Sequence, residues 1–229
     1  KYLRQAVHRQ MVSDVPLGAF LSGGLDSSAI VSFAKEKDPN IRCFTIETSG
    51  VQDRGIIDDL PYAKKVAKHL NVSLDVVTID SHRMANDLES MVIQLDEPLA
   101  DPAALNVLYI SKLARQQGIK VLLSGAGGDD LFTGYRRHYA LQLERYWAWM
   151  PKSARFGIEN LTRHLNVNSP IQRRVAKIFS GAGSDSTNRL INYFRWSSDT
   201  LLQSLYSPEF RHELAESNAN QVMQDFLEP

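Results

Sequence analysis

The stretch that decides the fold is Ala19-Phe20-Leu21-Ser22-Gly23-Gly24-Leu25-Asp26-Ser27-Ser28, near the start of the chain. An apolar run ends there in a loop of small residues, and a helical pattern follows from Ser27. A strand–loop–helix junction of this kind points backbone N–H groups and the positive end of a helix at a bound anion. Gly23 and Gly24 allow close approach of the backbone, and the serines add hydroxyl donors. The stretch therefore predicts a phosphate-binding loop.

Asp26 is the unusual member of this loop, because a carboxylate repels phosphate unless a cation lies between them. We therefore interpret Asp26 as a magnesium ligand. Two well-known phosphate loops do not fit. The Walker A pattern needs a lysine before its Ser or Thr, and the dinucleotide-binding fingerprint needs three glycines in G-x-G-x-x-G spacing.

The residues around this loop predict an α/β fold. Strand-like runs at 17–21, 41–46, 72–79 and 119–123 alternate with helical patterns at 1–12, 27–37, 58–70, 84–95 and 104–117. Such alternation is typical of a mostly parallel, twisted sheet flanked by helices. Ligands of these sheets bind beyond the carboxyl ends of the strands. We expect this α/β core to span residues 1–139.

The remainder, residues 140–229, contains no convincing strand and is expected to be a helical extension of the same domain, incomplete at its C-terminus. Its aromatic residues are interpreted as helix-packing residues. The glycine- and serine-rich stretch 180–186 is expected to be a mobile loop.

The composition excludes several classes of protein. Lys+Arg and Asp+Glu both number 26 in 229 residues, so net charge suggests neither nucleic acid nor a membrane as a partner. No apolar run approaches the roughly 18 residues of a membrane span. The single cysteine, Cys43, excludes an internal disulfide and fits a buried thiol in a reducing compartment, so we expect a cytoplasmic protein. Lys1 opens inside a helical pattern without a Met, which suggests a fragment.

A second glycine-rich loop follows the fourth predicted strand. It runs Leu123-Ser124-Gly125-Ala126-Gly127-Gly128-Asp129-Asp130-Leu131-Phe132-Thr133-Gly134-Tyr135. Like the first loop, it places glycines and then acids at the end of a strand. One Mg²⁺ could join Asp26 and Asp129 through a pyrophosphate, and charge neutralisation there favours displacement at an α-phosphate.

The first loop resembles the S-G-G-x-D-S signature of the ATP pyrophosphatases, the adenine-nucleotide α-hydrolase-like enzymes with a PP-loop. The two loops together resemble the synthetase domain of glutamine-hydrolysing asparagine synthetases, whose second motif reads S-G-x-G-x-D-E-x-F-x-G-Y. This resemblance covers about residues 1–140 well and implies a carbon–nitrogen ligase. ATP would activate a small carboxylic acid as an acyl-adenylate, and ammonia would then give the amide.

The resemblance also implies site residues and partners. Adenosine would be framed by Leu21, Ile46, Ser124 and Gly125. The pyrophosphate would be held by Ser22, Gly23, Gly24, Asp26 and Ser27, with Asp26 and Asp129 as ligands of Mg²⁺. Ammonia would come from a glutaminase domain outside this fragment, and a homodimer is one possible assembly.

The chain departs from the family pattern in its catalytic groups. Ala126 stands where asparagine synthetases carry an acid and the similar β-lactam synthetases a tyrosine, so Asp130 and Glu97 are the candidate catalytic residues. A lysine-bearing K-V-D-R-like stretch is also absent. Two alternatives stay open: a β-lactam-synthetase-like ligase with an internal amine, and a nucleotide-binding pseudoenzyme. The Asp96-Glu97-Pro98 signature suggests a sugar acid as one candidate substrate.

Overall fold

The computed structural model describes residues 1–49, 59–97, 99, 101, 103–166, 169–195, 197, 199–215 and 220–227. The chain divides into two compact units, Lys1–Phe132 and Thr133–Pro229. Each unit is described by itself below. Among the described residues, no helix combines the length and the apolar character needed to cross a membrane.

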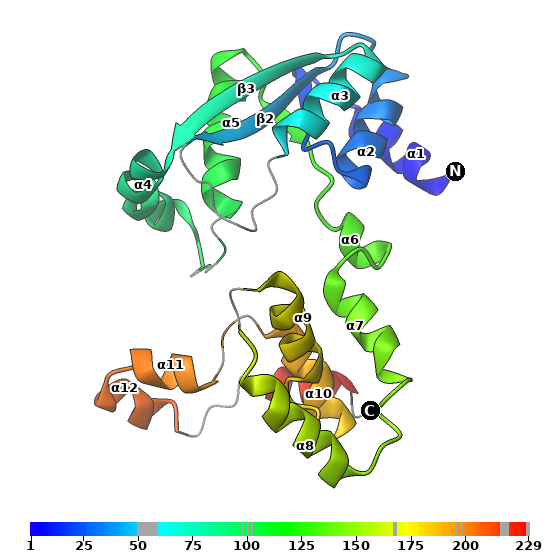
Figure 1. Ribbon diagram of the computed structural model, residues 1–229. Coiled ribbons are helices and arrows are strands. Elements are labelled where there is room, and N and C mark those ends of the chain that lie inside the picture. The colour runs from blue at the N-terminus through cyan, green and yellow to red at the C-terminus, as the bar shows by residue number, and fades with distance from the viewer. Residues whose placement is uncertain are drawn as a thin grey trace. The chain divides into compact units, whose positions relative to one another are not determined.

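The first unit has the predicted alternation of helices and strands (Figure 1). In chain order its elements are α1 (Tyr2–Gln10), β1 (Leu17–Phe20), α2 (Leu25–Lys35), β2 (Arg42–Ser49), α3 (Leu60–Leu70), β3 (Ser73–Asp80), α4 (Ser81–Gln94), α5 (Ala103–Gln116), β4 (Val121–Leu123) and α6 (Gly128–Leu131). All four predicted strands are present at or near the expected positions.

The four strands form one parallel sheet in the order β3-β2-β1-β4. Ala19 of β1 pairs with Cys43 of β2 on one side and with Leu123 of β4 on the other. The predicted α/β fold with a parallel sheet is therefore confirmed. Because the chain winds from β1 toward β3 and then returns to the opposite side of β1, the strand order reverses between β1 and β4. Ligands of open α/β sheets bind at such a reversal.

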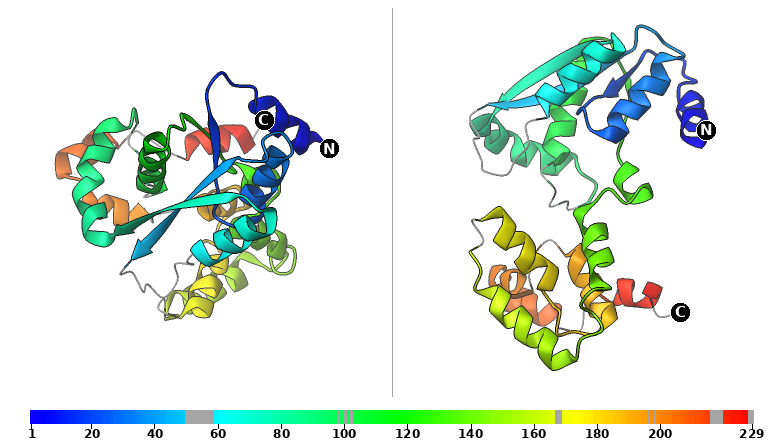
Figure 2. Two further views of the ribbon diagram at one scale, coloured as in Figure 1. Left: turned by 90° about the horizontal axis from the view of Figure 1, so that it is seen from above. Right: turned by 45° about the vertical axis from the view of Figure 1, so that its right-hand side comes forward.

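Helices cover both faces of the sheet (Figure 2). On one face, Ala19 and Cys43 pack against Val7 of α1, Val31 of α2 and Ala63 of α3. On the other face, helix α5 packs Ile110 against Phe44 of β2. Cys43 and Phe44 are consecutive residues on opposite faces, as the two-residue period of a strand requires. The result is a three-layer unit with a core on each side of the sheet.

Two helices begin earlier than the sequence pattern predicts. The helix expected from Ser27 begins at Leu25, with Gly24 at its N-cap. The helix expected from Met84 begins at Ser81, because the side chain of Asp80 accepts a hydrogen bond from the backbone N–H of Arg83 at 2.8 Å. An aspartate at this position satisfies a free N–H group of the first turn and starts the helix directly after the strand.

Helix α3 also begins differently from the prediction. The pattern predicts it from residue 58, but it begins at Leu60 with Asp59 as its N-cap residue, and Asp58 lies outside the described residues.

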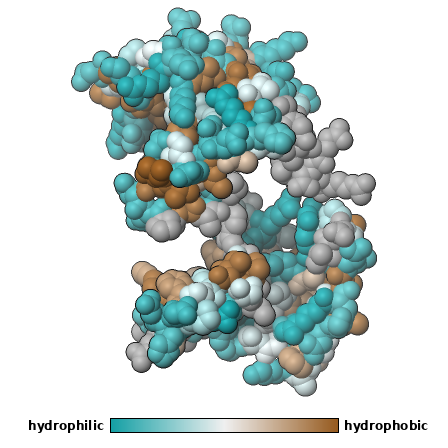
Figure 3. Space-filling view, turned by 90° about the vertical axis from the view of Figure 1, so that its left-hand side faces the viewer, coloured by the Kyte–Doolittle hydropathy of each residue, from teal (hydrophilic) through white to brown (hydrophobic). Residues whose placement is uncertain are grey.

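Helix α4 packs by one narrow stripe and leaves other apolar side chains exposed. Met91 is buried against Ile79 of β3 and Tyr109 of α5. Leu88, Val92 and Ile93 are exposed, and Figure 3 shows apolar side chains interrupting the hydrophilic surface on this side of the molecule.

The second unit consists of helices, as predicted for the C-terminal part of the chain. They are α7 (Arg136–Glu144), α8 (Lys152–Arg163), α9 (Pro170–Phe179), α10 (Ser186–Phe194), α11 (Asp199–Leu205), α12 (Pro208–Glu213) and α13 (Gln221–Leu227). The division between the units falls at Phe132, ahead of the change of pattern at Tyr139, because α7 packs against α10 of the second unit.

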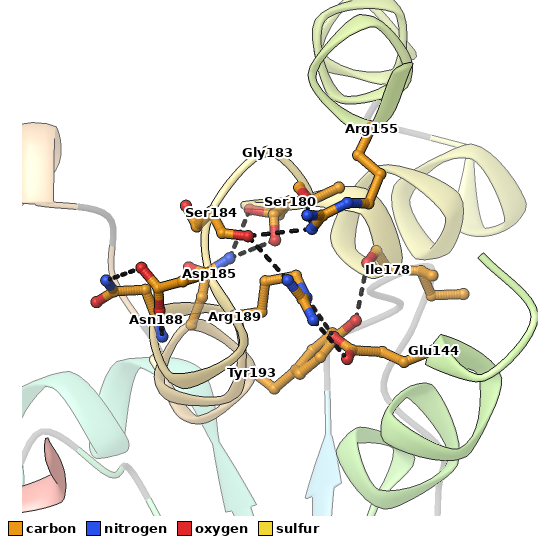
Figure 4. Close-up of polar contacts among 12 residues, drawn as sticks. Glu144, Arg155, Ile178, Ser180, Gly183, Ser184, Asp185, Asn188, Arg189 and Tyr193 are labelled. Carbon is orange, nitrogen blue, oxygen red and sulfur yellow. Dashed lines mark hydrogen bonds and ion pairs between the residues drawn. The ribbon is translucent and has the colours of Figure 1, made fainter. Parts of the chain in front are cut away.

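The stretch 180–186 is a hydrogen-bonded turn, against the expectation of a mobile loop (Figure 4). A guanidinium nitrogen of Arg155 donates to the carbonyls of Ala182 at 2.6 Å and Ser184 at 3.1 Å. The backbone N–H of Gly183, which is buried, donates to the Glu159 carboxylate at 3.0 Å. Charged side chains of α8 therefore hold this turn in place by hydrogen bonds.

The Glu159 carboxylate is stabilised in its charged form by these contacts. Burial raises the pKa of Glu159, but hydrogen bonds from the Gly183 backbone and the Arg163 side chain outweigh burial, and the net pKa is lowered.

An ion pair joins α7 to α10 in the same unit. Nε of Arg189 lies 3.1 Å from Oε1 of Glu144, and the Arg189 side chain is 8% exposed. The hydroxyl of Tyr193, one helical turn further along α10, donates to the carbonyl of Ile178 at 3.0 Å (Figure 4). Because a buried charge left without its partner is costly, this pair requires both helices to keep their positions.

Cys43 is fully buried in the centre of the sheet, as the sequence predicted. Burial, together with the nearby negative charge of Asp75, raises the pKa of the thiol to about 12. The thiolate is the reactive form of cysteine, and it is rare at neutral pH when the pKa is this high.

We expect a disulfide-exchange reagent at about pH 8 to label Cys43 in the folded protein about 10³-fold more slowly than in urea-unfolded protein. Absorbance of the released thiol measures both rates, and Cys43→Ser supplies the blank. Equal rates in the two states would contradict the buried position.

Candidate functional site

The first loop links the end of β1 to the start of α2 and is pressed against α3. Leu21 is buried, and its backbone N–H donates to the carbonyl of Phe44 at 2.9 Å. Gly23 has a φ of +81°, and a Cβ there would lie 2.4 Å from the backbone N of Ala63 and from the carbonyl carbon of Tyr62. Only glycine satisfies both conditions at this position.

The hydroxyl groups of this loop bond mainly to the loop itself. The Oγ atoms of Ser22 and Ser27 lie 3.0 Å apart, and the backbone N–H of Gly24 donates to Ser22 Oγ at 3.3 Å. The hydroxyls of Ser27 and Ser28 donate to the carbonyl of Gly24 at 3.2 and 2.7 Å. These bonds fix the shape of the turn that leads into the N-terminus of α2.

The second loop has a matching internal architecture. Ser124 Oγ accepts a hydrogen bond from the N–H of Ala126 at 3.1 Å, and the N–H of Gly128 donates to the carbonyl of Gly125 at 3.1 Å. Gly127 has a φ of +85° and is the N-cap residue of α6. The first turn of α6 then presents Asp129 and Asp130, acids at the positive end of a short helix.

The two loops are in direct contact, and glycines make this contact possible. A Cβ on Gly125 would lie 2.9 Å from the backbone N of Ser27. A Cβ on Gly128 would lie 2.3 Å from the carboxylate carbon of Asp26. The Asp26 carboxylate thus rests against the backbone of the residue that precedes Asp129.

The sequence pattern alone did not identify this role. The likeness to the first loop predicts that the glycines of the second loop allow close approach to a ligand, whereas in the structure Gly125 and Gly128 allow close approach of the first loop. The sequence signal for this contact was the Gly-Gly-Asp run of the second loop. That the first loop packs against this run could be found only from the pairing of β1 with β4.

The oxygen donors at this junction fit magnesium. Asp26 and Asp129 are both partly buried, and carboxylates are preferred ligands of Mg²⁺. Among the described residues there is no group of three or more His, Cys, Asp or Glu side chains placed to hold a metal. Mg²⁺ is usually bound by one or two protein carboxylates together with phosphate oxygens and water, so a pair such as Asp26 and Asp129 would be sufficient.

The structure does not bring all predicted site residues into this junction. The side chain of Leu21 lies in the core, and the side chain of Ile46 packs with Val77 between two core clusters. Asp130 is exposed in the first turn of α6. Glu97 is exposed in the bend after α4 and takes no part in the contacts between the loops.

Comparison with known proteins identifies the group to which these loops belong. The sequence profile of the family described as "Asparagine synthase" matches residues 1–227, so it includes both units. Asparagine synthetase (glutamine-hydrolysing) 1 of Bacillus subtilis is 41% identical over 130 residues, which are 57% of this chain and 20% of that protein.

Two further relatives cover a similar share. A putative glutamine-hydrolysing asparagine synthetase of Mycobacterium tuberculosis (strain H37Rv) is 35% identical over 164 residues, 71% of this chain and 24% of that protein. The protein named amidase chyE of Penicillium rubens is 30% identical over 149 residues, 59% of this chain and 22% of that protein. The chain thus spans less than a quarter of the length of each of these relatives.

Replacing Gly128 by alanine tests the contact between the loops. The new Cβ would displace the Asp26 carboxylate, so we expect Gly128→Ala to weaken magnesium-dependent ATP binding by about tenfold, as when the group that orients a metal ligand is lost. Titration calorimetry measures the affinity, and circular dichroism should show an unchanged helix content. Gly157→Ala is the matched control, because its Cβ would meet open space. An unchanged affinity in Gly128→Ala would refute the contact.

Proposed function

Because the chain belongs to the asparagine synthase family, we propose that it is the ATP-using part of a synthetase that converts a carboxylic acid into its amide. The observation that carries this proposal is the contact of the Asp26 carboxylate with Gly128, which joins the two phosphate-type loops into one site.

The proposed reaction has two steps. A carboxylate oxygen of the substrate attacks the α-phosphorus of ATP, the bond from that phosphorus to the bridging oxygen breaks, and pyrophosphate leaves. Ammonia then attacks the carbonyl carbon of the acyl-adenylate. A carbon–nitrogen bond forms, AMP leaves, and the nitrogen gives up a proton.

The residues of the chain divide between binding and charge control. The backbone N–H groups at Gly23 and Gly24 and the N-terminus of α2 would bind the departing pyrophosphate. Asp26 and Asp129 would hold Mg²⁺, which neutralises the charge of the leaving group. Serine hydroxyls that already bond within the loop keep these donors in place before ATP binds.

The ammonia source and the acid substrate are also proposals. The Bacillus and Mycobacterium relatives are named glutamine-hydrolysing synthetases, and this chain covers 20% and 24% of their lengths. We therefore propose that glutamine is hydrolysed by a further domain of a longer protein. The acid can be aspartate, a sugar acid or another small carboxylic acid.

Proton transfer in the second step needs a group other than Ala126. The Ala126 side chain is exposed and cannot accept a proton, whereas its backbone N–H is bonded to Ser124. Asp130 is the first candidate, since it lies in the helix turn that also carries Asp129. Glu97 is the second candidate and would need a substrate that extends to the bend after α4.

Ala126 also supports a second candidate function. Without an acid or a tyrosine at this position, the chain could bind ATP and not turn it over. The other alternative is a ligase in which an amine of the substrate itself, instead of ammonia, attacks the activated carboxylate.

Removal of either proposed metal ligand should abolish the effect of Mg²⁺ on ATP affinity. We expect Asp26→Asn and Asp129→Asn each to weaken ATP binding about tenfold or more in Mg²⁺ and to change it little in EDTA. Glu89→Gln, which removes one exposed charge from α4, is the control. Retention of the full magnesium effect in both variants would remove the site assignment.

A second experiment separates the two chemical steps. With the protein at its natural length and ammonium as nitrogen donor, we expect Asp130→Asn to slow amide formation by about 10²–10⁴-fold and to leave ATP–pyrophosphate exchange nearly unchanged. If only Glu97→Gln shows this behaviour, Glu97 is the base. If none of the candidate acids supports ATP–pyrophosphate exchange, this result would favour a chain that binds ATP without turning it over.

A further inference from the structure

The second unit contains a cavity of about 730 Å³, whose lining residues begin directly after the second loop, at Arg136. It lies among α7, α9 and α10, all within residues 133–229. Five basic side chains line it, namely Arg136, Arg137, Arg173, Arg174 and Lys177, together with Tyr139 and Tyr193. Its volume falls within the range of about 300–1,000 Å³ that is typical of small-molecule sites.

The charge of this cavity is of one sign. Among the described residues, no acidic side chain lines it. Glu144 lies beside Tyr193, but its carboxylate is paired with the guanidinium of Arg189 at 3.1 Å (Figure 4). The charge of the acid that lies beside the cavity-lining Tyr193 is therefore already neutralised by the buried Arg189.

Three of the arginines have hydrogen-bond donors that no described residue uses. The guanidinium groups of Arg136, Arg173 and Arg174 are exposed and form no hydrogen bond or ion pair with any residue in the described part of the chain. A guanidinium presents its donors in a planar fork that matches the oxygens of phosphate and carboxylate.

Lys177 and Arg137 are held in place around the cavity. Nζ of Lys177 donates to the carbonyls of Asn192 and Arg195 at 3.2 and 3.3 Å. Burial, and then the positive charge of Arg195, lower the pKa of Lys177. The guanidinium carbon of Arg137 lies 3.8 Å from the ring centre of Tyr135 and 4.8 Å from that of Phe194.

Helix α7 adds to the positive potential. Its first turn carries Arg136 and Arg137 and no acid, the reverse of the arrangement that stabilises a helix N-terminus. Like charges gathered at the positive end of a nine-residue helix are unfavourable unless an anion offsets them. The arrangement costs stability in the free protein, and a bound anion would remove that cost.

We propose that this cavity binds a small organic polyanion that carries two or more phosphate or carboxylate groups. The arginine forks and Lys177 would bind the oxyanions, and the rings of Tyr139 and Tyr193 would contact the body of the molecule. The proposal does not depend on the reaction assigned to the two loops, because no residue of either loop lines the cavity.

Titration calorimetry of the whole chain tests the site, with inorganic tripolyphosphate and citrate as probes. The measurements are made in buffer freed of metal by a chelating resin, because the loops of the first unit carry acids and would bind phosphate poorly without a metal, and because EDTA is itself a polycarboxylate that could compete for the cavity. We expect saturable binding of at least one probe that weakens as salt is added. A preference for tripolyphosphate indicates an organic phosphate as the natural ligand, and a preference for citrate indicates a polycarboxylate.

The double variant Arg173→Gln/Arg174→Gln should weaken this binding about tenfold or more, because it removes two charge-assisted contacts. Its matched control is Arg115→Gln/Arg211→Gln, which removes the same charge from exposed arginines that do not line the cavity. Circular dichroism establishes that both variants are folded.

Three results would overturn the proposal. They are no binding of either probe by the wild type, equal loss in the two double variants, and binding of a single-stranded oligonucleotide through these arginines without binding of either small anion.

Discussion

The parallel pairing of β1 with β4 is the constraint on which the candidate site depends. Ala19 is level with Leu123, so the two strands end side by side and their loops begin next to each other. The Asp26 carboxylate then lies against Gly128, at a separation that leaves no room for a Cβ. The first-loop acid reaches the second loop because the strand order reverses here, and residues about a hundred positions apart come to share one junction.

The two units carry opposite local electrostatics although the chain has no net charge. The loops of the first unit offer backbone donors, helix ends and two carboxylates, so the phosphate binding that we propose there would depend on a metal. The cavity of the second unit offers five cations and needs no metal for an anion. A balance of 26 basic and 26 acidic residues conceals this separation, because total charge says nothing about how charges are grouped in space.

Strand positions and the family could be predicted from sequence, since both depend on short patterns. Alternation predicted four strands, and the two loop motifs predicted the family whose profile matches residues 1–227. Helix starts were less accurate, because Asp80 acts as an N-cap whose effect depends on one hydrogen bond to Arg83. The stretch 180–186 looked mobile from its small residues, but Arg155 and Glu159, which hold it, are contributed by α8.

The sequence by itself determined the parallel α/β core, the phosphate-type loops and the departure at Ala126, because each of these is written in contiguous residues. Only the tertiary structure decided that Gly125 and Gly128 accommodate the first loop, that the side chain of Leu21 belongs to the core, and that arginines from α7 and α9 surround one cavity. Contacts of this kind depend on strand order and helix packing, which bring together residues with no relation in the linear pattern.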